Sequence, residues 1–395
     1  MKPTQQIERI KGLMDRYLEV VHSDKNKENQ KLWKNSYDWN RDKLRGIAPT
    51  REGNPLPYVV ELDISLWRKF CGDVSLLKFY SDPYVHMELQ LQQKLKHHEM
   101  FDDNFVYTDE LSLWFGVVTE LSFFGSEIVF QELKEAWIKE PILHEYEDLD
   151  KLTPPDFRKS GLMPKILECY EVMSEVADGK LKVMFPELAR GPFCIAVHLR
   201  GMEDFLCDTI AEPEWVHRLM RFIVDAHKSW SKERAKFVGK EQDKCKLFND
   251  EICSPIIGPA TYDNFVFPYE KELAEHYGGV RYFHSCGLLD PFLPRIAELP
   301  GLDACHVGPW TSYEEADRVF GDRTALEICL HPMEDVMMAK EDQMRGKIED
   351  IMEKCKHRNY SLRADTFMPS GDLNQQMEKI HLWESVAKKT FKVRG

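Results

Sequence analysis

Histidine and cysteine recur where successive apolar segments end in the second half of the chain. In chain order, these ends read His284-Ser285-Cys286, Cys305-His306, Cys329-Leu330-His331 and Arg363-Ala364-Asp365. His284 and Cys286 lie two residues apart, so on a strand their side chains point to the same side. An imidazole and a thiolate placed in this way suit zinc, a borderline-soft ion. The alternative interpretation is a core histidine beside a buried cysteine.

A catalytic zinc site has three protein ligands and one open position, so a third ligand is needed. Cys329 is the first choice, because its thiol is soft and it ends the next segment but one after Cys286. Its alternative role is that of a small buried hydrophobe. The reserve candidates are Asp250, Glu251, Cys305 and His306.

Other polar residues near these ends could bind a substrate or transfer protons. Asp250 and Glu251 end a strand-like run, where a carboxylate could hold metal, act as acid or base, or stabilise a helix start. Arg190 lies in a turn and could bind an acidic group or form a plain ion pair. Trp310 follows a Gly-Pro pair and could form an aromatic wall or simply pack.

The segments that must position these residues alternate between strand and helix. Strands are predicted at 57–63, 127–130, 180–186, 192–198, 244–251, 280–286, 302–308, 324–331 and 359–365. Helices are predicted at 4–21, 213–238, 261–279, 288–298, 311–320, 333–356 and 371–390, while 64–150 reads as mostly helical and 25–34 as a loop or helix edge. Continuous apolar strands between helices are typical of a parallel sheet buried on both faces.

This pattern predicts an α/β fold, a (β/α)₈ TIM barrel over residues 56–395 with an N-terminal helical extension over 1–55. The strands' carboxyl ends then form one rim, and that rim holds the site.

Bulk properties narrow the class of protein. The 395 residues carry a net charge of −14, which disfavours general binding of nucleic acid. The start of the chain lacks the apolar core of a signal peptide, and no apolar run is long enough to span a bilayer. We therefore expect a cytoplasmic protein, with no membrane attachment and with its ten cysteines reduced.

Four segments resemble the uroporphyrinogen decarboxylase-like superfamily: NDEICSPIIGP (249–259), YFHSCG (282–287), ACHVGPW (304–310) and LEICLHP (326–332). The match is closest to its methyltransferase branch, which includes methylcobamide:coenzyme M methyltransferases and the methyltransferase components of O-demethylase systems. The resemblance covers about residues 180–390 well and the first half loosely. The chain has no segment like the arginine-bearing MRQAGRY stretch of true decarboxylases.

The resemblance implies a (β/α)₈ barrel with zinc on an H-x-C…C pattern. His284 and Cys286 match the first two positions, whereas the position of the final cysteine matches Thr366, beside Asp365. Cys329 or a rim acid is then the substitute ligand.

The function expected from these observations is zinc-dependent transfer of a methyl group between a small methoxylated, methylamine or thiol substrate and a corrinoid (cobalamin). The corrinoid belongs to a partner protein, because this chain has no D-x-H-x-x-G corrinoid-binding segment. A homodimer is one assembly compatible with the sequence. The roles are metal binding for His284, Cys286 and Cys329, catalysis for Glu251, His306 and His331, and substrate binding for Asp250, Arg190, Trp310 and Asp365.

Two alternatives remain. A metal-independent decarboxylase would hold a substrate carboxylate with arginines such as Arg190, Arg200 and Arg363. A non-catalytic barrel would bind a corrinoid or another small ligand without turnover.

Overall fold

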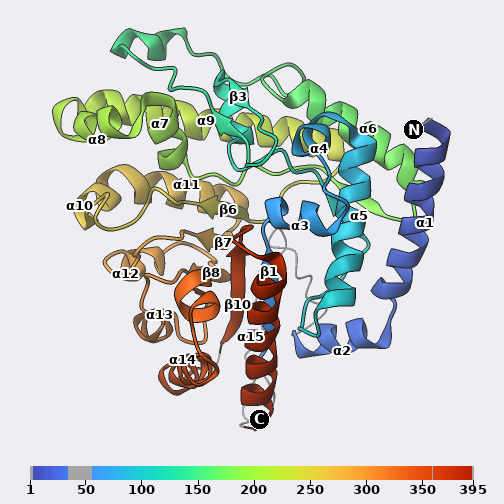
Figure 1. Ribbon diagram of the computed structural model, residues 1–395. Coiled ribbons are helices and arrows are strands. Elements are labelled where there is room, and N and C mark those ends of the chain that lie inside the picture. Colours follow the sequence, from blue (N-terminus) through green and yellow to red (C-terminus); the bar gives the residue numbers. More distant parts are fainter. Residues whose placement is uncertain (1–2, 34–55, 358, 394–395) are drawn as a thin grey trace.

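Eight parallel strands form the centre of the molecule. The computed structural model describes residues 3–33, 56–357 and 359–393 (Figure 1). In these ranges the parallel strands are β1 (Tyr58–Leu62), β2 (Glu110–Ser112), β5 (Lys182–Met184), β6 (Cys245–Phe248), β7 (Val280–His284), β8 (Ala304–Val307), β9 (Ala325–Leu330) and β10 (Tyr360–Phe367). Each is followed by helical structure, which confirms the predicted (β/α)₈ barrel.

The hydrogen-bonded ladders divide the barrel into two parts. Six strands form one sheet in the order β1-β10-β9-β8-β7-β6, and β2 pairs with β5. The part with β5 joins β6 through a single bridge between Arg190 and Phe248. On the other side, β1 is bonded by the segment before β2, where the Asn104 N–H donates to the Tyr58 carbonyl at 3.0 Å and the Val60 N–H donates to Asp103 at 2.9 Å.

The register of the strands shows which residues face the barrel interior. Tyr282 pairs with Ala304, and Ala304 pairs with Ala325. These residues belong to a small buried cluster, separate from the main core, that also contains Trp33, Val59 and Val106. Because side chains alternate along a strand, residues two or four positions beyond them also face inward. These residues are His284, His306, Glu327 and Cys329.

The helices cover the outside of the strands, with α9, α11, α12, α13 and α14 following one another along the sheet in Figure 1. Their bounds are α9 (Pro213–Val238), α11 (Phe267–Tyr277), α12 (Leu293–Ile296), α13 (Tyr313–Phe320), α14 (Glu341–Lys354) and α15 (Leu373–Val393). A π-helical turn, Tyr262–Val266, precedes α11, and another, Pro332–Met337, precedes α14. Three further helices are α6 (Met163–Ala177), α8 (Met202–Ala211) and α10 (Pro259–Thr261). No helix in the described ranges has the length and apolar character needed to cross a bilayer.

The N-terminal helices differ in part from the prediction. Helix α1 (Pro3–Val21) is confirmed and packs on α5 (Pro83–Met100). Of the two alternatives for 25–34, a loop or a helix edge, the structure excludes the loop, because helix α2 (Asp24–Leu32) occupies this segment. This helix is polar and has no apolar stripe, and its buried Asn26 donates to the Tyr107 carbonyl instead. The predicted boundary between the N-terminal extension and the barrel, after residue 55, lies at the end of segment 34–55, which is outside the described residues.

Two other segment predictions are wrong. The run at 192–198 is helix α7 (Pro192–Arg200), not a strand; it is buried on all sides, so its apolar sequence has no helical stripe. Residues 64–150 are helical only in α3 (Ile64–Phe70), α4 (Leu76–Ser81), α5 and the short 3₁₀ turns Thr119–Phe124 and Tyr146–Lys151. The rest contains β2 and a small hairpin of β3 (Ile128–Val129) and β4 (Trp137–Ile138).

Candidate functional site

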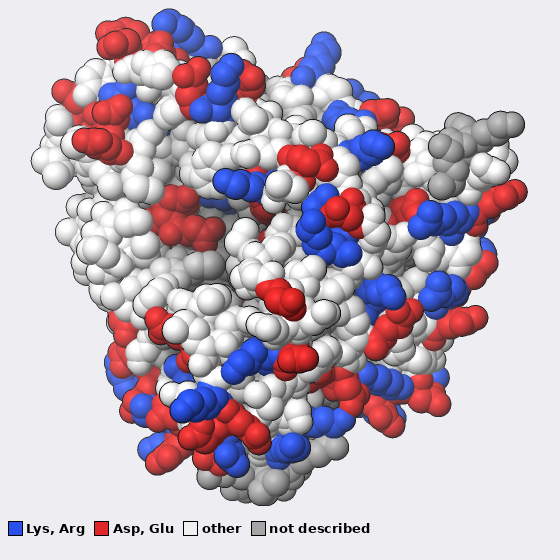
Figure 2. Space-filling view, in the orientation of Figure 1, with Lys and Arg blue, Asp and Glu red and all other residues white. Residues whose placement is uncertain are grey.

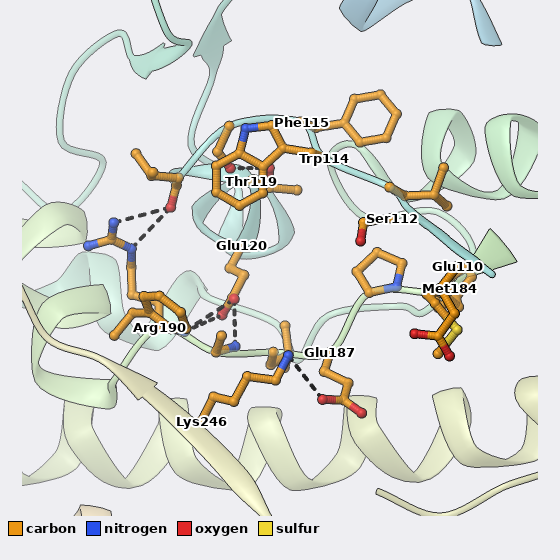
Figure 3. A pocket seen from close by; sticks show the side chains of 18 of the residues that line it. Glu110, Ser112, Trp114, Phe115, Thr119, Glu120, Met184, Glu187, Arg190 and Lys246 are labelled. Carbon is orange, nitrogen blue, oxygen red and sulfur yellow. Dashed lines mark hydrogen bonds and ion pairs between the residues drawn. The ribbon is translucent and has the colours of Figure 1, made fainter. Parts of the chain in front are cut away.

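A cavity of about 1190 Å³ lies along the part of the barrel formed by β2 and β5. It is lined by Asp250 and His284 at the carboxyl end of the six-stranded sheet, by Asp365 and Thr366 near the end of β10, and by Arg190. Figure 2 shows a hollow left of centre with acidic side chains at its edge. Figure 3 shows part of the cavity wall, where Trp114 and Phe115 lie near Glu120 and Lys246 reaches toward Glu187.

His284, at the end of β7, lies between Asp250 and Cys286. Its Nε2 is 3.3 Å from Asp250 Oδ1 and 3.4 Å from Cys286 Sγ. Burial opposes protonation of this imidazole, but the hydrogen bonds with Asp250 and Cys286 outweigh burial and raise its pKa to about 9. Burial likewise raises the pKa of Asp250, yet the bond from His284 holds that pKa below its usual range. Without metal, His284 therefore carries a proton at neutral pH.

His306, predicted as a catalytic residue, lies in this cluster. Its ring centroid is 4.2 Å from that of His284, and its Nδ1 is 2.8 Å from the Ser285 carbonyl oxygen. Because a carbonyl can only accept, Nδ1 carries a proton, and Nε2 is the ring nitrogen left for a metal. The ligand atoms of His284, Cys286 and His306 all lie within 4.8 Å of one another.

Cys329, predicted as the third metal ligand, lies in a neighbouring group. Its sulfur, a carboxylate oxygen of Glu327 and a ring nitrogen of His306 also lie within 4.8 Å of one another. Glu327 is fully buried and accepts from the Tyr282 hydroxyl at 2.8 Å. The sequence interpretation missed Glu327; an acid inside the apolar run ALEICL, two residues before Cys329, was the available signal.

Glu251 and Arg190 are partners of each other. Arg190 Nη1 is 3.3 Å from Glu251 Oε2, and His198 Nε2 is 2.5 Å from Glu251 Oε1. Burial raises the pKa of Glu251, but these two partners outweigh burial and lower it. His198 was missed because its segment was interpreted as a strand. Glu120 was also missed; it lines the cavity and accepts from the Ala189 and Arg190 backbone N–H groups, and burial raises its pKa to about 7.

The remaining predicted residues lie on the rim or near it. Trp310 is 59% exposed, and its ring contacts that of His331 with centroids 5.3 Å apart. His331 caps the turn before α14 by accepting from the Glu334 N–H at 3.1 Å. Asp365 accepts a hydrogen bond from Arg363 Nη1 at 3.2 Å.

The arginines needed by a decarboxylase are engaged by protein carboxylates. Arg363 also contacts Glu61 at 2.7 Å, and Arg200 pairs with Asp208 at 2.8 Å. Arg190 is bound to Glu251, so all three arginines have acidic partners. Of these three, only Arg190 lines the cavity.

A buried acid behind the site gives a testable pH effect. Glu270 on α11 accepts from Asn249 Nδ2 at 2.6 Å and from the Tyr262 hydroxyl at 3.0 Å, which fixes the end of β6. Burial raises its pKa to about 7. The folded protein therefore binds a proton here more tightly than the unfolded chain, and stability falls as pH rises from about 4.5 to about 7.

We expect Glu270→Gln, which cannot ionise, to remove this loss. The free energy of unfolding of the variant minus that of the wild type should be about 2 kcal/mol larger at pH 8 than at pH 5. Denaturant unfolding at both pH values measures the difference. Glu275→Gln on the same helix, with a side chain 59% exposed, is the matched control and should show no such change. A pH-independent difference for Glu270→Gln would contradict the assignment.

The sequence and the fold both have counterparts among known proteins. The chain is 26% identical over 159 residues to the methylated-thiol--coenzyme M methyltransferase of Methanosarcina mazei, a match that covers 40% of this chain and 42% of that relative's length. A solved structure described as a methyltransferase from Methanosarcina mazei has the same fold, with a TM-score of 0.60 at 16% identity, over 84% of this chain and 94% of that one. The family profile described as Uroporphyrinogen decarboxylase (URO-D) matches residues 67–362. Since this match covers more than half of the chain, the protein belongs to the uroporphyrinogen decarboxylase family.

Proposed function

We propose that the protein is a methyltransferase that moves a methyl group between a small substrate and a corrinoid carried by a partner protein, with zinc as Lewis acid. The observation that carries the proposal is the cluster of His284, Cys286 and His306 at the carboxyl end of the barrel strands. The similarity to the methylated-thiol--coenzyme M methyltransferase supports the same reaction class.

The donor set fits zinc. In a tetrahedral site with a Zn–N distance of about 2.0 Å and a Zn–S distance of about 2.3 Å, the nitrogen and sulfur ligands lie roughly 3.5 Å apart. His284 Nε2 and Cys286 Sγ are separated by 3.4 Å. When bound here, zinc would polarise the atom from which the methyl group departs.

The chain's own residues have to position the substrate and supply a proton. Transfer from a methoxyl group to a Co(I) corrinoid breaks the C–O bond and forms a C–Co bond, and the leaving oxygen takes the electron pair and a proton. Burial raises the pKa of the cavity-lining Glu120 to about 7 and that of Glu135 to about 6, so Glu120 keeps its proton closer to neutral pH than Glu135 does and is the better proton donor of the two. Asp250 and Asp365 line the same cavity and can bind polar groups of the substrate.

The surface around the site supports a protein partner. Seven exposed hydrophobic residues lie no more than eight positions beyond the ends of β2, β6, β8, β9 and β10: Trp114, Val117, Ile256, Trp310, Met333, Met338 and Met368. We call this set the apolar rim. The described connections that enter the amino ends of β6 to β10 expose no large hydrophobic side chain. Exposed aromatic and methionine side chains are typical of docking surfaces.

The experiment that tests the proposal is a methyl-transfer assay on the zinc-loaded protein. Co(I) corrinoid is offered with a methoxylated aromatic, a methylamine or a methylated thiol, and methylcorrinoid is followed by its absorbance. We expect methylation with at least one donor class. Failure with every donor, in both directions of transfer, would overturn the proposal.

The apolar rim gives a separate prediction. Met338 is 72% exposed, and Met338→Asp should weaken binding of the corrinoid protein by about 10-fold or more while leaving transfer to free cobalamin unchanged. Ile210→Asp, at a position on α8 that is 86% exposed, is the control and should not change binding. Equal binding by both variants would exclude Met338 from the docking surface.

A further inference from the structure

The third metal ligand can be assigned from the positions of the side chains. We infer that the metal is held by two imidazoles and one thiolate, from His284, His306 and Cys286, with Cys329 outside the ligand set. This inference rests on the proposed function, because it concerns the metal of the same site. It replaces the ligand set expected from the sequence.

Distance favours His306 over Cys329. Among the described residues, His306 is the one whose ligand atom lies within 4.8 Å of those of both His284 and Cys286 in a three-residue group. Cys329 groups with Glu327 and His306 instead. Three ligands of one ion must lie about 3.5 Å apart, so His306 needs little movement to complete the site.

The orientation of His306 is fixed for metal binding. The ring is buried on β8, and its Nδ1–H donates to the carbonyl of Ser285, the residue between the two other ligands. Ser285 is itself held, because its hydroxyl donates to the Ile252 carbonyl at 3.1 Å. A histidine ligand that donates its other N–H to a carbonyl has its tautomer and direction set in advance.

The neighbouring Glu327–Cys329 group is less suited to metal. Glu327 Oε1 accepts a hydrogen bond from the Tyr282 hydroxyl at 2.8 Å and lies 3.6 Å from Arg363 Nη1. A metal there would have to displace a buried ion pair and a hydrogen bond. Cys329 Sγ donates to the same oxygen at 3.9 Å, so this thiol already has a partner within the group.

The carboxyl end of β10 offers no thiol. Asp365 accepts a hydrogen bond from Arg363, and the next residue is Thr366, whose side chain is a hydroxyl. A neutral hydroxyl is a poorer zinc ligand than an imidazole or a thiolate.

The ligand charge bears on the substrate. Two neutral imidazoles and one thiolate leave the zinc centre one unit more positive than one imidazole and two thiolates would. A more positive centre polarises an oxygen or nitrogen leaving group more strongly and lowers electron density on a bound thiolate. The geometry therefore favours methoxyl or methylamine donors over methylated thiols.

The test is metal binding by purified full-length variants, read by zinc content and by the sulfur-to-metal absorption band of the cobalt-substituted protein. We expect Cys329→Ser to keep both the metal and the band. His306→Ala should lower metal affinity by more than the 10- to 100-fold typical of a residue outside the ligand shell. Added imidazole should restore part of that affinity.

His306→Cys provides a signal that a misfolded protein cannot give. We expect it to bind metal and to show a stronger band, from two thiolates instead of one. Metal retained by His306→Ala but lost in Cys329→Ser would overturn the inference and leave the zinc site at His284 and Cys286 intact. Absence of bound metal in the wild type would instead overturn the metal role in the proposed function.

Discussion

Replacing His284 by Ala together with Cys286 by Ser is expected to remove the metal and to lower the rate of methyl transfer by about 1000-fold or more. The Lewis acid supplies several kcal/mol of stabilisation to the charge that develops on the leaving atom, and each 1.4 kcal/mol corresponds to about a factor of ten in rate. Metal content and single-turnover methylation of a corrinoid, measured on the same samples, check both parts of this result.

The control separates loss of metal from loss of a thiol or of the fold. Cys207 is exposed on α8, so Cys207→Ser removes a thiol far from the ligand cluster and should leave both readouts unchanged. Thermal melting of the double variant shows whether it is folded. Normal methyl transfer by a folded, metal-free double variant would exclude the metal from the reaction.

The second large effect concerns stability. Glu251→Ala leaves the Arg190 guanidinium and His198 buried without the carboxylate that they share. Breaking a buried ion pair by removing one partner costs about 3–5 kcal/mol, because the other charge stays desolvated. Denaturant unfolding should show a loss of this size in the free energy of unfolding.

Two comparisons sharpen the result for Glu251. Asp150 pairs with Arg218 on the surface, where both side chains are more than half exposed, so Asp150→Ala should cost less than about 1 kcal/mol. Replacing Arg190 by Met and Glu251 by Leu together should recover part of the loss, since the buried charge of Arg190 is then removed together with its partner. A loss for Glu251→Ala as small as that for Asp150→Ala would show that water replaces the carboxylate.

The second half of the fold could be predicted from the sequence because each strand from β6 to β10 is a buried apolar run followed by polar residues. Segment 192–198 has the same composition, but its nine-residue helix is buried on every side, so sequence periodicity cannot distinguish it from a strand. Strand β2 was missed because it has three residues. The polar helix α2 depends on buried asparagine bonds to residues distant in sequence, which no local pattern encodes.

The pairing of His284 with Cys286 could be predicted because two residues that are i and i+2 on a strand share a side. The third ligand could not be chosen on chemistry alone. Softness favours Cys329, whereas our proposal of His306 rests on strand order, because β9 is two strands away from β7 and β8 is adjacent. Adjacent strands lie about 4.8 Å apart and next neighbours about twice that far. The ion pair between Glu251 and Arg190 joins residues 61 positions apart and depends on the tertiary fold.

The barrel is divided into a six-stranded and a two-stranded part, and this division separates the proposed metal ligands from much of the cavity wall. His284 and His306 lie on β7 and β8 of the larger sheet, whereas Trp114, Phe115 and Glu187 of the cavity wall follow the short strands β2 and β5. Between the smaller part and β6, the strand pairing is a single bridge. Substitutions or insertions that reshape the binding wall can therefore accumulate without disturbing the ladders that hold the ligand cluster. Divergent substrate preference within one reaction type is the expected outcome of such a construction.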